Sequence, residues 1–159
     1  MADISIITVG TLKEAYLKDA VAEYKKRLSQ YARVDEISLK EERISDEDNQ
    51  SEICRALDAE GDRILATVPK GSSIVAMCVE GVQMDSPALA TQIGKMIDAR
   101  GKITFVIGSS HGLSQKVKSA AELKLSVSKL TFPHQLMRVV LMETVYRSFT
   151  ILAGKKYHK

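Results

Sequence analysis

The chain contains few of the residues that mark metal-binding or disulfide-stabilised proteins. Among its 159 residues there are two cysteines, three histidines, three prolines and no tryptophan. Cys54 and Cys78 match no metal-ligand spacing, and we expect both to be reduced thiols. Neither a disulfide framework nor a bound metal is therefore expected.

The sequence also lacks the segments that direct a chain to a membrane or mark a nucleotide hydrolase. No apolar run is long enough to cross a bilayer, and the N-terminus has neither the basic stretch nor the cleavage-like site of a signal peptide. The pattern G-x-x-x-x-G-K-[ST] is absent, which disfavours ATP or GTP hydrolysis. We expect a cytoplasmic protein with no membrane partner, most simply a single domain over residues 1–159.

The net charge of +3 hides a separation of charge along the chain. Residues 35–62 hold 11 acidic and three basic side chains, a balance of −8, so the remainder carries +11. From Arg138 onward there are five basic residues and one acid. The pattern indicates a basic region able to meet phosphate and an acidic region that avoids it, although solvated surfaces give similar runs.

Short β-rich runs alternate with longer segments of helical periodicity. We expect strands over residues 4–9, 34–39, 73–79, 103–107 and 122–127, and helices over residues 13–30, 52–66, 86–99 and 133–153. Such alternation predicts an α/β fold in which helices sandwich a mostly parallel sheet. Ligands bind at the carboxyl ends of such strands, so the loops after Val79, Ile107 and Val127 are the candidate binding loops.

One of these loops, Gly108-Ser-Ser-His-Gly112, fits the G-x-S-x-G pattern of serine hydrolases, with Ser110 as the nucleophile. The pattern has only three fixed positions, and the hydrolase fold needs a larger chain. We therefore favour a tight turn whose glycines let a ligand approach the backbone, with a serine hydrolase as the alternative. The hydrolase triad would be completed by one of two acid–histidine pairs: Glu122 with His134, or Glu143 with His158.

The last expected helix is apolar on nearly every side. It has more apolar residues than a single face packed on the core requires. The surplus predicts a second buried face, most simply the contact of a symmetric homodimer. Arg147 can pair with Glu143 four residues earlier, whereas Arg138 lies on roughly the opposite face. One of the two arginines is then expected to be free for a phosphate or a carboxylate.

The chain ends in a basic tail, Lys155-Lys-Tyr-His-Lys159. Residues at chain termini commonly have no function unless contacts with the rest of the protein hold them in place. His158 nevertheless follows Tyr157 where no packing function is evident, which makes it a candidate functional residue. His134, near the start of the last helix, is more typical of a structural hydrogen-bonding residue.

Several C-terminal features resemble the RlmH (YbeA-like) family of SPOUT methyltransferases: Thr131-Phe-Pro-His-Gln-Leu-Met-Arg, Tyr146-Arg147, Gly154 and Tyr157-His-Lys159. Residues 9–14 and 107–113 are similar to the same family, so the resemblance runs end to end. It implies a homodimeric enzyme that uses S-adenosylmethionine to methylate N3 of a pseudouridine in 23S ribosomal RNA on the assembled ribosome. It also implies a C-terminal trefoil knot (an α/β-knot), which periodicity alone does not indicate.

Carried over by position, the resemblance implies a cofactor site at the candidate loops, formed by Met77, Gly108, Val127, Ser128, Lys129, Leu130, Thr131 and Phe132. The sequence departs from the family at Ser109, where a second glycine usually follows, and this change leaves open a non-catalytic RNA-binding dimer. Thr144 stands where glutamine is frequent, and Lys155-Lys156 stand where a small residue or a proline often precedes the tyrosine.

Methylation at an imide nitrogen requires a base or a stabilised anion. We expect His158 or Tyr157, from the tail of one subunit, to close over the cofactor of the other subunit. Arg138 is a further candidate, as a catalytic residue or as a phosphate contact. The remaining basic residues are expected to hold RNA phosphate: Arg147, Lys155, Lys156 and Lys159.

Overall fold

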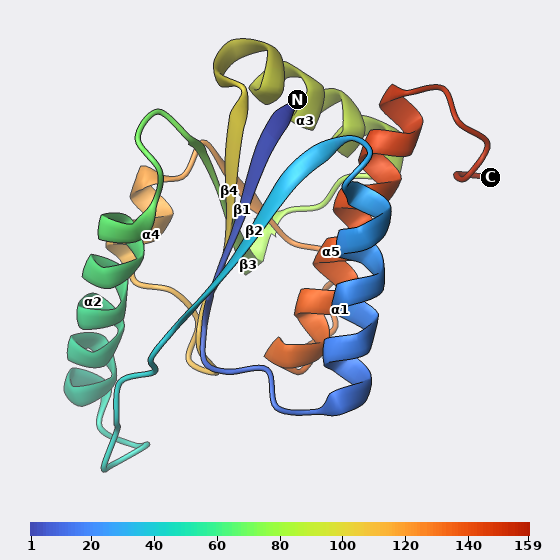
Figure 1. The fold of residues 1–159 in the computed structure, drawn as a ribbon. Coiled ribbons are helices and arrows are strands. Elements are labelled where there is room, and N and C mark those ends of the chain that lie inside the picture. The colour runs from blue at the N-terminus through green and yellow to red at the C-terminus, as the bar shows by residue number, and fades with distance from the viewer.

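The computed structural model describes residues 1–159 as five strands that alternate with five helices (Figure 1). The strands are β1 (Ala2–Val9), β2 (Ala32–Leu39), β3 (Ser73–Val82), β4 (Lys102–Ile107) and β5 (Leu123–Leu125). The helices are α1 (Ala15–Leu28), α2 (Gln50–Thr67), α3 (Ser86–Arg100), α4 (Gln115–Ala120) and α5 (His134–Leu152). None of them combines the length and apolarity that crossing a membrane requires.

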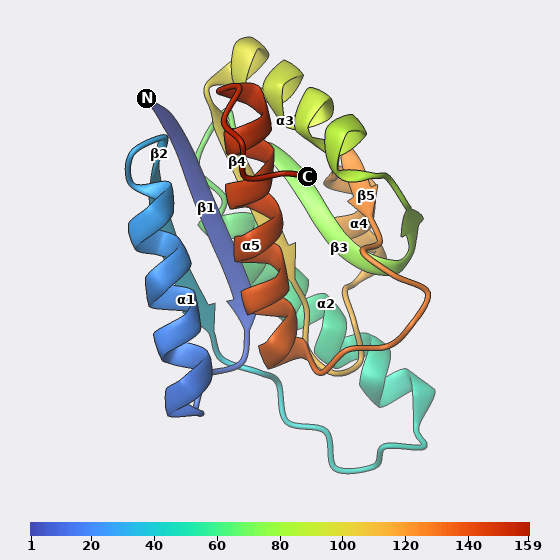
Figure 2. The same cartoon turned by 90° about the vertical axis from the view of Figure 1, so that its right-hand side faces the viewer.

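The five strands form one sheet in the order β2-β1-β4-β3-β5, with every pairing parallel. The connections from β1 to β2 and from β3 to β4 run toward one edge, and those from β2 to β3 and from β4 to β5 run toward the other. Because such crossovers are right-handed, opposite directions place their helices on opposite faces. Accordingly, α1 and α3 cover one face with α5 between them, and α2 and α4 cover the other (Figures 1 and 2). The predicted α/β sandwich is confirmed.

Neighbouring residues on the central strands belong to two separate apolar layers of the core, one on each face of the sheet. Phe105 packs in the larger layer, beneath α1, α3 and α5, while Val106 packs in the smaller layer, beneath α2 and α4. Both side chains are completely buried. Successive side chains of a strand point to opposite faces, so the consecutive apolar residues 105–107 of β4 are what a strand covered on both faces requires.

The sequence prediction missed one helix and made one strand too long. The helix α4 was not predicted, because six residues are too few to show a helical period, although Ser114 caps it by accepting from the Val117 amide. The strand β5 has three residues, where six were expected. Asp85 caps α3 by accepting from the Ala88 amide at 2.8 Å.

Candidate functional site

The carboxyl ends of β3, β4 and β5 open into a cavity of about 470 Å³. It is lined by residues 77–80 of β3, residues 107–113 after β4, and most of residues 125–134 between β5 and α5. This volume is within the range of small-molecule sites. The three predicted binding loops therefore converge on one cavity.

The loop after β4 is a tight turn that brings its backbone close to the cavity. The Gly112 amide donates to the Ser109 carbonyl at 2.9 Å. A side chain on Gly108 would overlap the Gly112 carbonyl. Gly112 has φ of +92°, a conformation that glycine adopts without strain. The turn thus requires glycine at both positions. At residue 108 the Gly112 carbonyl leaves no space for a side chain, and at residue 112 the backbone φ is positive.

The segment between β5 and α5 is held by its own serines. The Ser126 hydroxyl donates to the Ser128 carbonyl at 2.9 Å, and the Ser128 hydroxyl accepts from the Leu130 amide at 3.0 Å. The Ser126 amide donates to the Val82 carbonyl at 3.0 Å, which ties the segment to the end of β3. These bonds fix the backbone along one wall of the cavity.

The structure brings together most of the residues predicted to bind a cofactor. Those that line the cavity are Met77, Gly108, Val127, Ser128, Leu130, Thr131 and Phe132. Lys129 belongs to the same segment but is not among the lining residues. Their function in binding stays a prediction, while their proximity is a property of the fold.

Sequence reasoning missed several lining residues: Cys78, Glu80, Lys118, His134 and Met137. Lys118 lies on the unpredicted helix α4, and Met137 gave no signal beyond being an apolar position of the last helix. Glu80 and Lys118 form an ion pair, and the Lys118 hydrogen bond holds the pKa of the Glu80 carboxyl below its usual value. Burial raises the pKa of the Cys78 thiol, so the thiol stays protonated at neutral pH.

These residues fit S-adenosylmethionine. Met77, Ile107 and Leu113 offer apolar contact to an adenine ring, and the two ordered turns offer backbone groups to its polar edge. The absence of a side chain at Gly108 lets the turn fold tightly against its own Gly112 carbonyl, which keeps the turn compact at the edge of the cavity. No group of three or more His, Cys, Asp or Glu side chains is placed to hold a metal ion.

The side chain of Arg138, a residue of α5, is buried near the carboxyl ends of β1 and β2. The residue is only 6% exposed, and its Nη2 donates to the Gly10 carbonyl at 2.8 Å and to the Ser38 hydroxyl at 3.0 Å. Its Nε is buried without a hydrogen-bond partner, and burial lowers the pKa of the guanidinium. The expectation that one helix arginine is free for an anion is wrong for Arg138, because the protein itself binds this side chain.

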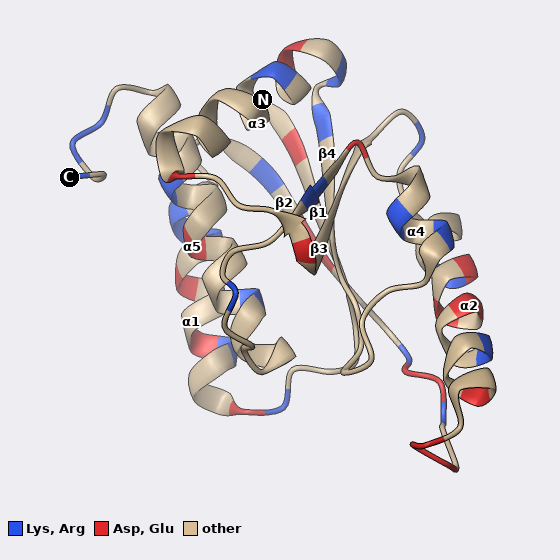
Figure 3. Cartoon of the chain, turned by 180° about the vertical axis from the view of Figure 1, so that it is seen from behind, with Lys and Arg blue, Asp and Glu red and all other residues tan.

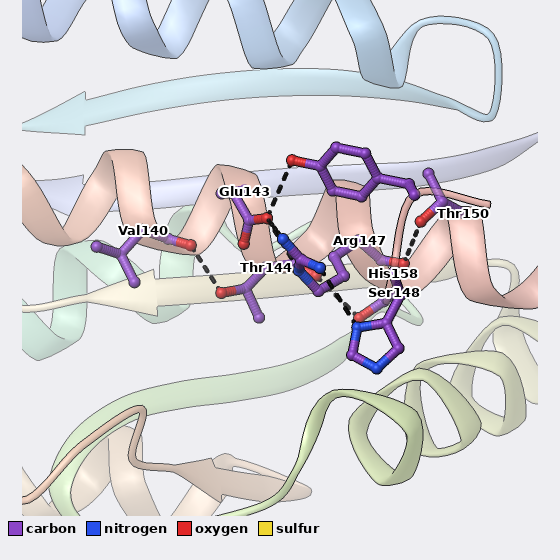
Figure 4. A network of polar contacts seen from close by, with 8 residues as sticks. Val140, Glu143, Thr144, Arg147, Ser148, Thr150 and His158 are labelled. Atoms are coloured by element: carbon purple, nitrogen blue, oxygen red, sulfur yellow. Dashed lines mark hydrogen bonds and ion pairs between the residues drawn. The ribbon is translucent and has the colours of Figure 1, made fainter. Parts of the chain in front are cut away.

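The C-terminal tail folds back onto its own α5, and Arg147 is the centre of the contact (Figure 4). Arg147 donates to Glu143 Oε1 through Nε at 2.9 Å and through Nη2 at 2.6 Å, which confirms the predicted pair. Its Nη1 lies 3.3 Å from Nδ1 of His158. The Tyr157 hydroxyl donates to Glu143 Oε1 at 3.2 Å, and its ring meets Tyr146 edge-on with the centroids 4.9 Å apart.

This docked tail is remote from the cavity of its own chain. The α5 residues that line the cavity are His134 and Met137, near the start of the helix. Arg147 lies ten residues beyond Met137, or about 15 Å along the helix axis at 1.5 Å per residue. Figure 2 shows the same separation, with the C-terminus at one end of α5 and the β5–α5 segment at the other.

Neither triad of the serine-hydrolase alternative is assembled. Ser110 lines the cavity. Glu122 precedes β5, at the opposite end of that strand, and pairs with Arg100 at 3.1 Å. Glu143 and His158 belong to the tail contact on α5. The serine pattern is therefore part of a turn without a catalytic acid and base.

The acidic region lies beside the cavity. Figure 3 shows acidic residues on the segment that precedes α2 and on α2 itself. Glu47 Oε2 in that segment pairs with His111 Nε2 of the cavity turn at 2.7 Å. The predicted separation of charge is present, but its acidic part contacts the cavity turn directly, an arrangement the charge count did not indicate.

Comparison with known proteins places the chain in a family. The family model described as "Predicted SPOUT methyltransferase" matches residues 2–158. "Ribosomal RNA large subunit methyltransferase H" of Streptococcus agalactiae (strain NEM316) is 48% identical over 157 residues, covering 98% of this chain and 99% of the relative. Proteins of the same description from Caldicellulosiruptor bescii and Bacillus pumilus are 48% and 47% identical, covering 98% and 99% of this chain and 99% of each relative.

A solved structure described as "Structural insights into the 2-OH methylation of C/U34 on tRNA" shares the fold. Its TM-score is 0.51 at 12% sequence identity, over 97% of this chain and 99% of that one. At this identity the likeness concerns the fold alone. The family match and the relatives cover nearly the whole chain, and on these grounds the chain belongs to the SPOUT methyltransferases, in the group of the ribosomal RNA large subunit methyltransferases H.

Proposed function

We propose that this protein is an S-adenosylmethionine-dependent methyltransferase that acts on N3 of a pseudouridine in 23S ribosomal RNA, on the assembled ribosome in the cytoplasm. The observation that carries the proposal is the cavity at the carboxyl ends of β3, β4 and β5, which is lined by residues that the family resemblance assigns to the cofactor. The names of the relatives point to RNA of the large ribosomal subunit. The choice of pseudouridine and of N3 rests on the resemblance.

S-adenosylmethionine supplies an electrophilic methyl group attached to a sulfonium sulfur. When bound in the cavity, it would supply this methyl group to N3 of the nucleobase, and the N3 proton would have to pass to a proton acceptor of the protein. The protein has to align the two reactants and accept or relay that proton. Apolar side chains of the cavity, among them Met77 and Leu113, exclude water from the reacting atoms.

His158 is a better candidate for the base than Tyr157. Burial and the neighbouring Glu143 carboxylate raise the pKa of the Tyr157 phenol above its usual value. In the docked tail the phenol therefore stays protonated at neutral pH, and a released phenol with the ordinary pKa of about 10 would stay protonated as well, so Tyr157 is a poor proton acceptor in either state. We assign proton transfer to the His158 imidazole, and to Tyr157 the placement of that imidazole.

The tail has to act on the cavity of a second subunit. In its docked position His158 contacts Arg147, far along α5 from the cavity of its own chain. A second copy packed against α5 would bring a tail close to a cavity without unfolding the helix. The function therefore includes a homodimer with two composite sites, each built from a cavity of one chain and a tail of the other.

The outward face at the start of α5 is the proposed dimer contact. The residue Leu136 is 37% exposed, and Val139 and Val140 are only partly buried. Val139 also packs in part against the core, and most other apolar residues of α5 are covered by the sheet and by α1 and α3 on either side. The dimer face is thus narrower than the sequence suggested and lies next to the cavity.

The tail lysines are placed to hold RNA. Lys155, Lys156 and Lys159 are exposed and have no ion-pair partner. Arg147 would join them once the tail leaves α5. Arg138, by contrast, has a structural function in the interior, where its hydrogen bonds to Gly10 and Ser38 hold α5 against β1 and β2.

We also propose the trefoil knot that the family resemblance implies. The sheet order places β4 between β1 and β3, and β5 beyond β3, so the chain has to return past earlier loops to reach α5. The bond from the Ser126 amide to the Val82 carbonyl holds this return close to the end of β3. Both observations support a threaded segment at the cavity.

The function is tested by methyl transfer from labelled S-adenosylmethionine to ribosomes that lack the modification, followed by digestion of the RNA to nucleosides. We expect about one methyl group per ribosome, recovered as N3-methylated pseudouridine. Label in another nucleoside, or no label, would contradict the proposal. Calorimetry that detects no cofactor binding, with or without ribosomes, would favour a non-catalytic RNA-binding dimer.

A further inference from the structure

Glu80 and Lys118 form an ion pair at the wall of the cavity, and the proposed chemistry does not use it. The contact joins Oε1 of Glu80, near the end of β3, to Nζ of Lys118 on α4. These two are the only Asp, Glu, Lys or Arg side chains among the residues that line the cavity. The cavity wall thus carries one negative and one positive charge, side by side.

The backbone that carries each charge is anchored by its neighbours. Val117, the residue before Lys118, is completely buried in the smaller apolar layer, beneath α2 and α4. Gly81, the residue after Glu80, lies so close to β5 that a Cβ there would overlap the Lys124 carbonyl. The positions of the two charges along the wall are therefore set by the fold, and only the long side chains are left to adjust.

Both charged groups are accessible to a ligand, and their mutual contact saturates neither. The Lys118 side chain is 21% exposed and the Glu80 side chain is 59% exposed. The carboxylate has a second oxygen and the ammonium has three N–H groups, so acceptor capacity remains on one side and donor capacity on the other. A ligand that carries both signs of charge can bind to both groups without breaking the pair.

We propose that Lys118 and Glu80 bind the amino-acid end of S-adenosylmethionine, with the Lys118 ammonium donating to the cofactor carboxylate and the Glu80 carboxylate accepting from the cofactor ammonium. The proposal rests on the assignment of this cavity to S-adenosylmethionine. That end of the cofactor carries one carboxylate and one ammonium, so its charges match those of the wall one to one. Such charge-assisted hydrogen bonds are about twice as strong as neutral ones.

The spacing along β3 agrees with this assignment. Met77 offers apolar contact to the adenine, and Glu80 follows it by three residues, at most about 10 Å along an extended strand. The base and the amino acid are the opposite ends of the cofactor. One cofactor molecule can therefore contact Met77 and Glu80 at once, with its ribose and sulfonium between them.

The simplest competing explanation is that the ion pair only ties α4 to β3. Lys116 forms such a tie on the same helix, because its Nζ pairs with Asp62 of α2 at 2.7 Å and the residue does not line the cavity. The two explanations differ in their dependence on the ligand. Loss of a tie affects every ligand of the cavity, whereas loss of a binding group affects only ligands that carry its partner.

The test measures three ligands against three variants by calorimetry. S-adenosylmethionine carries both charged groups, decarboxylated S-adenosylmethionine keeps the ammonium alone, and methylthioadenosine lacks the whole amino-acid end. The variants are Lys118→Ala, Glu80→Gln and, as the matched control, Lys116→Ala. The Kd of each ligand is compared between variant and wild type, and methyl transfer is measured at saturating cofactor.

We expect K118A to weaken binding of S-adenosylmethionine about tenfold (about 1.4 kcal/mol) and to bind the decarboxylated form no more weakly than the wild type does. E80Q should weaken the decarboxylated form about tenfold, because the remaining ammonium loses its partner. Methylthioadenosine should bind all variants within about twofold of the wild type, and K116A should bind all three ligands normally. The kcat at saturating cofactor should stay within about threefold of the wild type in every variant.

Equal losses for all three ligands in K118A would overturn the proposal in favour of a structural tie. Unchanged binding of S-adenosylmethionine in K118A would also overturn it. Should K118A fail to fold, E80Q, which keeps the shape of the side chain, decides the matter through the decarboxylated form. A wild-type protein that binds neither S-adenosylmethionine nor methylthioadenosine would contradict the proposed function as well, whereas the other adverse results leave that function intact.

Discussion

The Arg147 guanidinium lies over the ring of Tyr157, with its Cζ 4.7 Å from the ring centroid. The same guanidinium is held by Glu143, so one ion pair on α5 anchors the aromatic residue of the tail. The two paired side chains are 28% and 25% exposed, and solvent screens such a pair. The tail is thus held in a defined position by contacts weak enough to release it when RNA or a second subunit offers better ones.

Glu143→Ala is expected to free the tail while leaving the fold intact. The free energy of unfolding should fall by less than about 1 kcal/mol, because the pair is partly exposed. Trypsin should cut after Lys155 and Lys156 several-fold faster in this variant, because Arg147 and Tyr157 both lose their partner. Glu23→Ala breaks an equivalent pair four residues apart on α1, with Arg27, and is the control. Equal cleavage rates in both variants would show that the docked tail is not held by Glu143.

Arg138→Ala is expected to destabilise the protein by about 3 kcal/mol, because the substitution empties a buried site and leaves the Gly10 carbonyl and the Ser38 hydroxyl without a donor. The free energy of unfolding is measured in urea. Arg33→Ala is the control: Arg33 is exposed and pairs with Asp3, and its loss should cost less than about 1 kcal/mol. A cost for Arg138→Ala no larger than that of the control would argue against a structural function and favour contact with RNA.

The strand and helix order was predictable because each element carries its own periodicity. Residues 103–107 were predicted as a strand, and Phe105 and Val106 are buried on opposite sides of β4. The right-handed crossover rule then assigns the four helices that connect strands to a face, whereas α5, which follows the last strand, is placed by its contacts with α1 and α3. What periodicity could not supply is α4, whose six residues make less than two turns.

The candidate site was only partly predictable, for a related reason. Position along the strands indicates which loops meet, so residues such as Met77 and Gly108 could be expected together. Contacts between distant segments leave no local pattern, and neither the burial of Glu60 on α2 against the Glu42 amide nor the binding of Arg138 to Gly10 has a sequence signal. The apolar surplus of α5 was attributed to a dimer, yet much of it is used by α1 and α3 within one chain.

The pH dependence of stability should change when Glu60 is replaced by glutamine. The folded-state pKa of Glu60 is raised by burial, so the folded protein binds a proton more tightly than the unfolded chain does. The carboxyl therefore destabilises the fold increasingly as pH rises from its unfolded pKa, about 4.3, through its folded pKa. Glu60→Gln removes this dependence.

The difference in unfolding free energy between Glu60→Gln and the wild type should consequently favour the variant more at pH 7 than at pH 4. Urea unfolding at a series of pH values measures it, and the subtraction cancels the other carboxyls, including Glu52 and Glu80, whose pKa values are lowered. A difference that is constant over this range would mean that the Glu60 pKa is the same in the folded and unfolded states.

Mixed dimers decide whether the tail serves the cavity of the other subunit. His158→Ala should abolish methyl transfer while sparing cofactor binding, and Gly108→Val should abolish cofactor binding because a side chain there overlaps the Gly112 carbonyl. Each variant alone is expected to be inactive. When the two are mixed and allowed to exchange subunits, about half of the dimers are mixed, and each has one intact cavity facing one intact tail. Activity should then recover to about a quarter of the wild-type value, since half of the dimers carry one of two sites. If each tail serves its own chain, no mixed dimer contains a complete site and the mixture stays inactive, a result that would contradict the composite site.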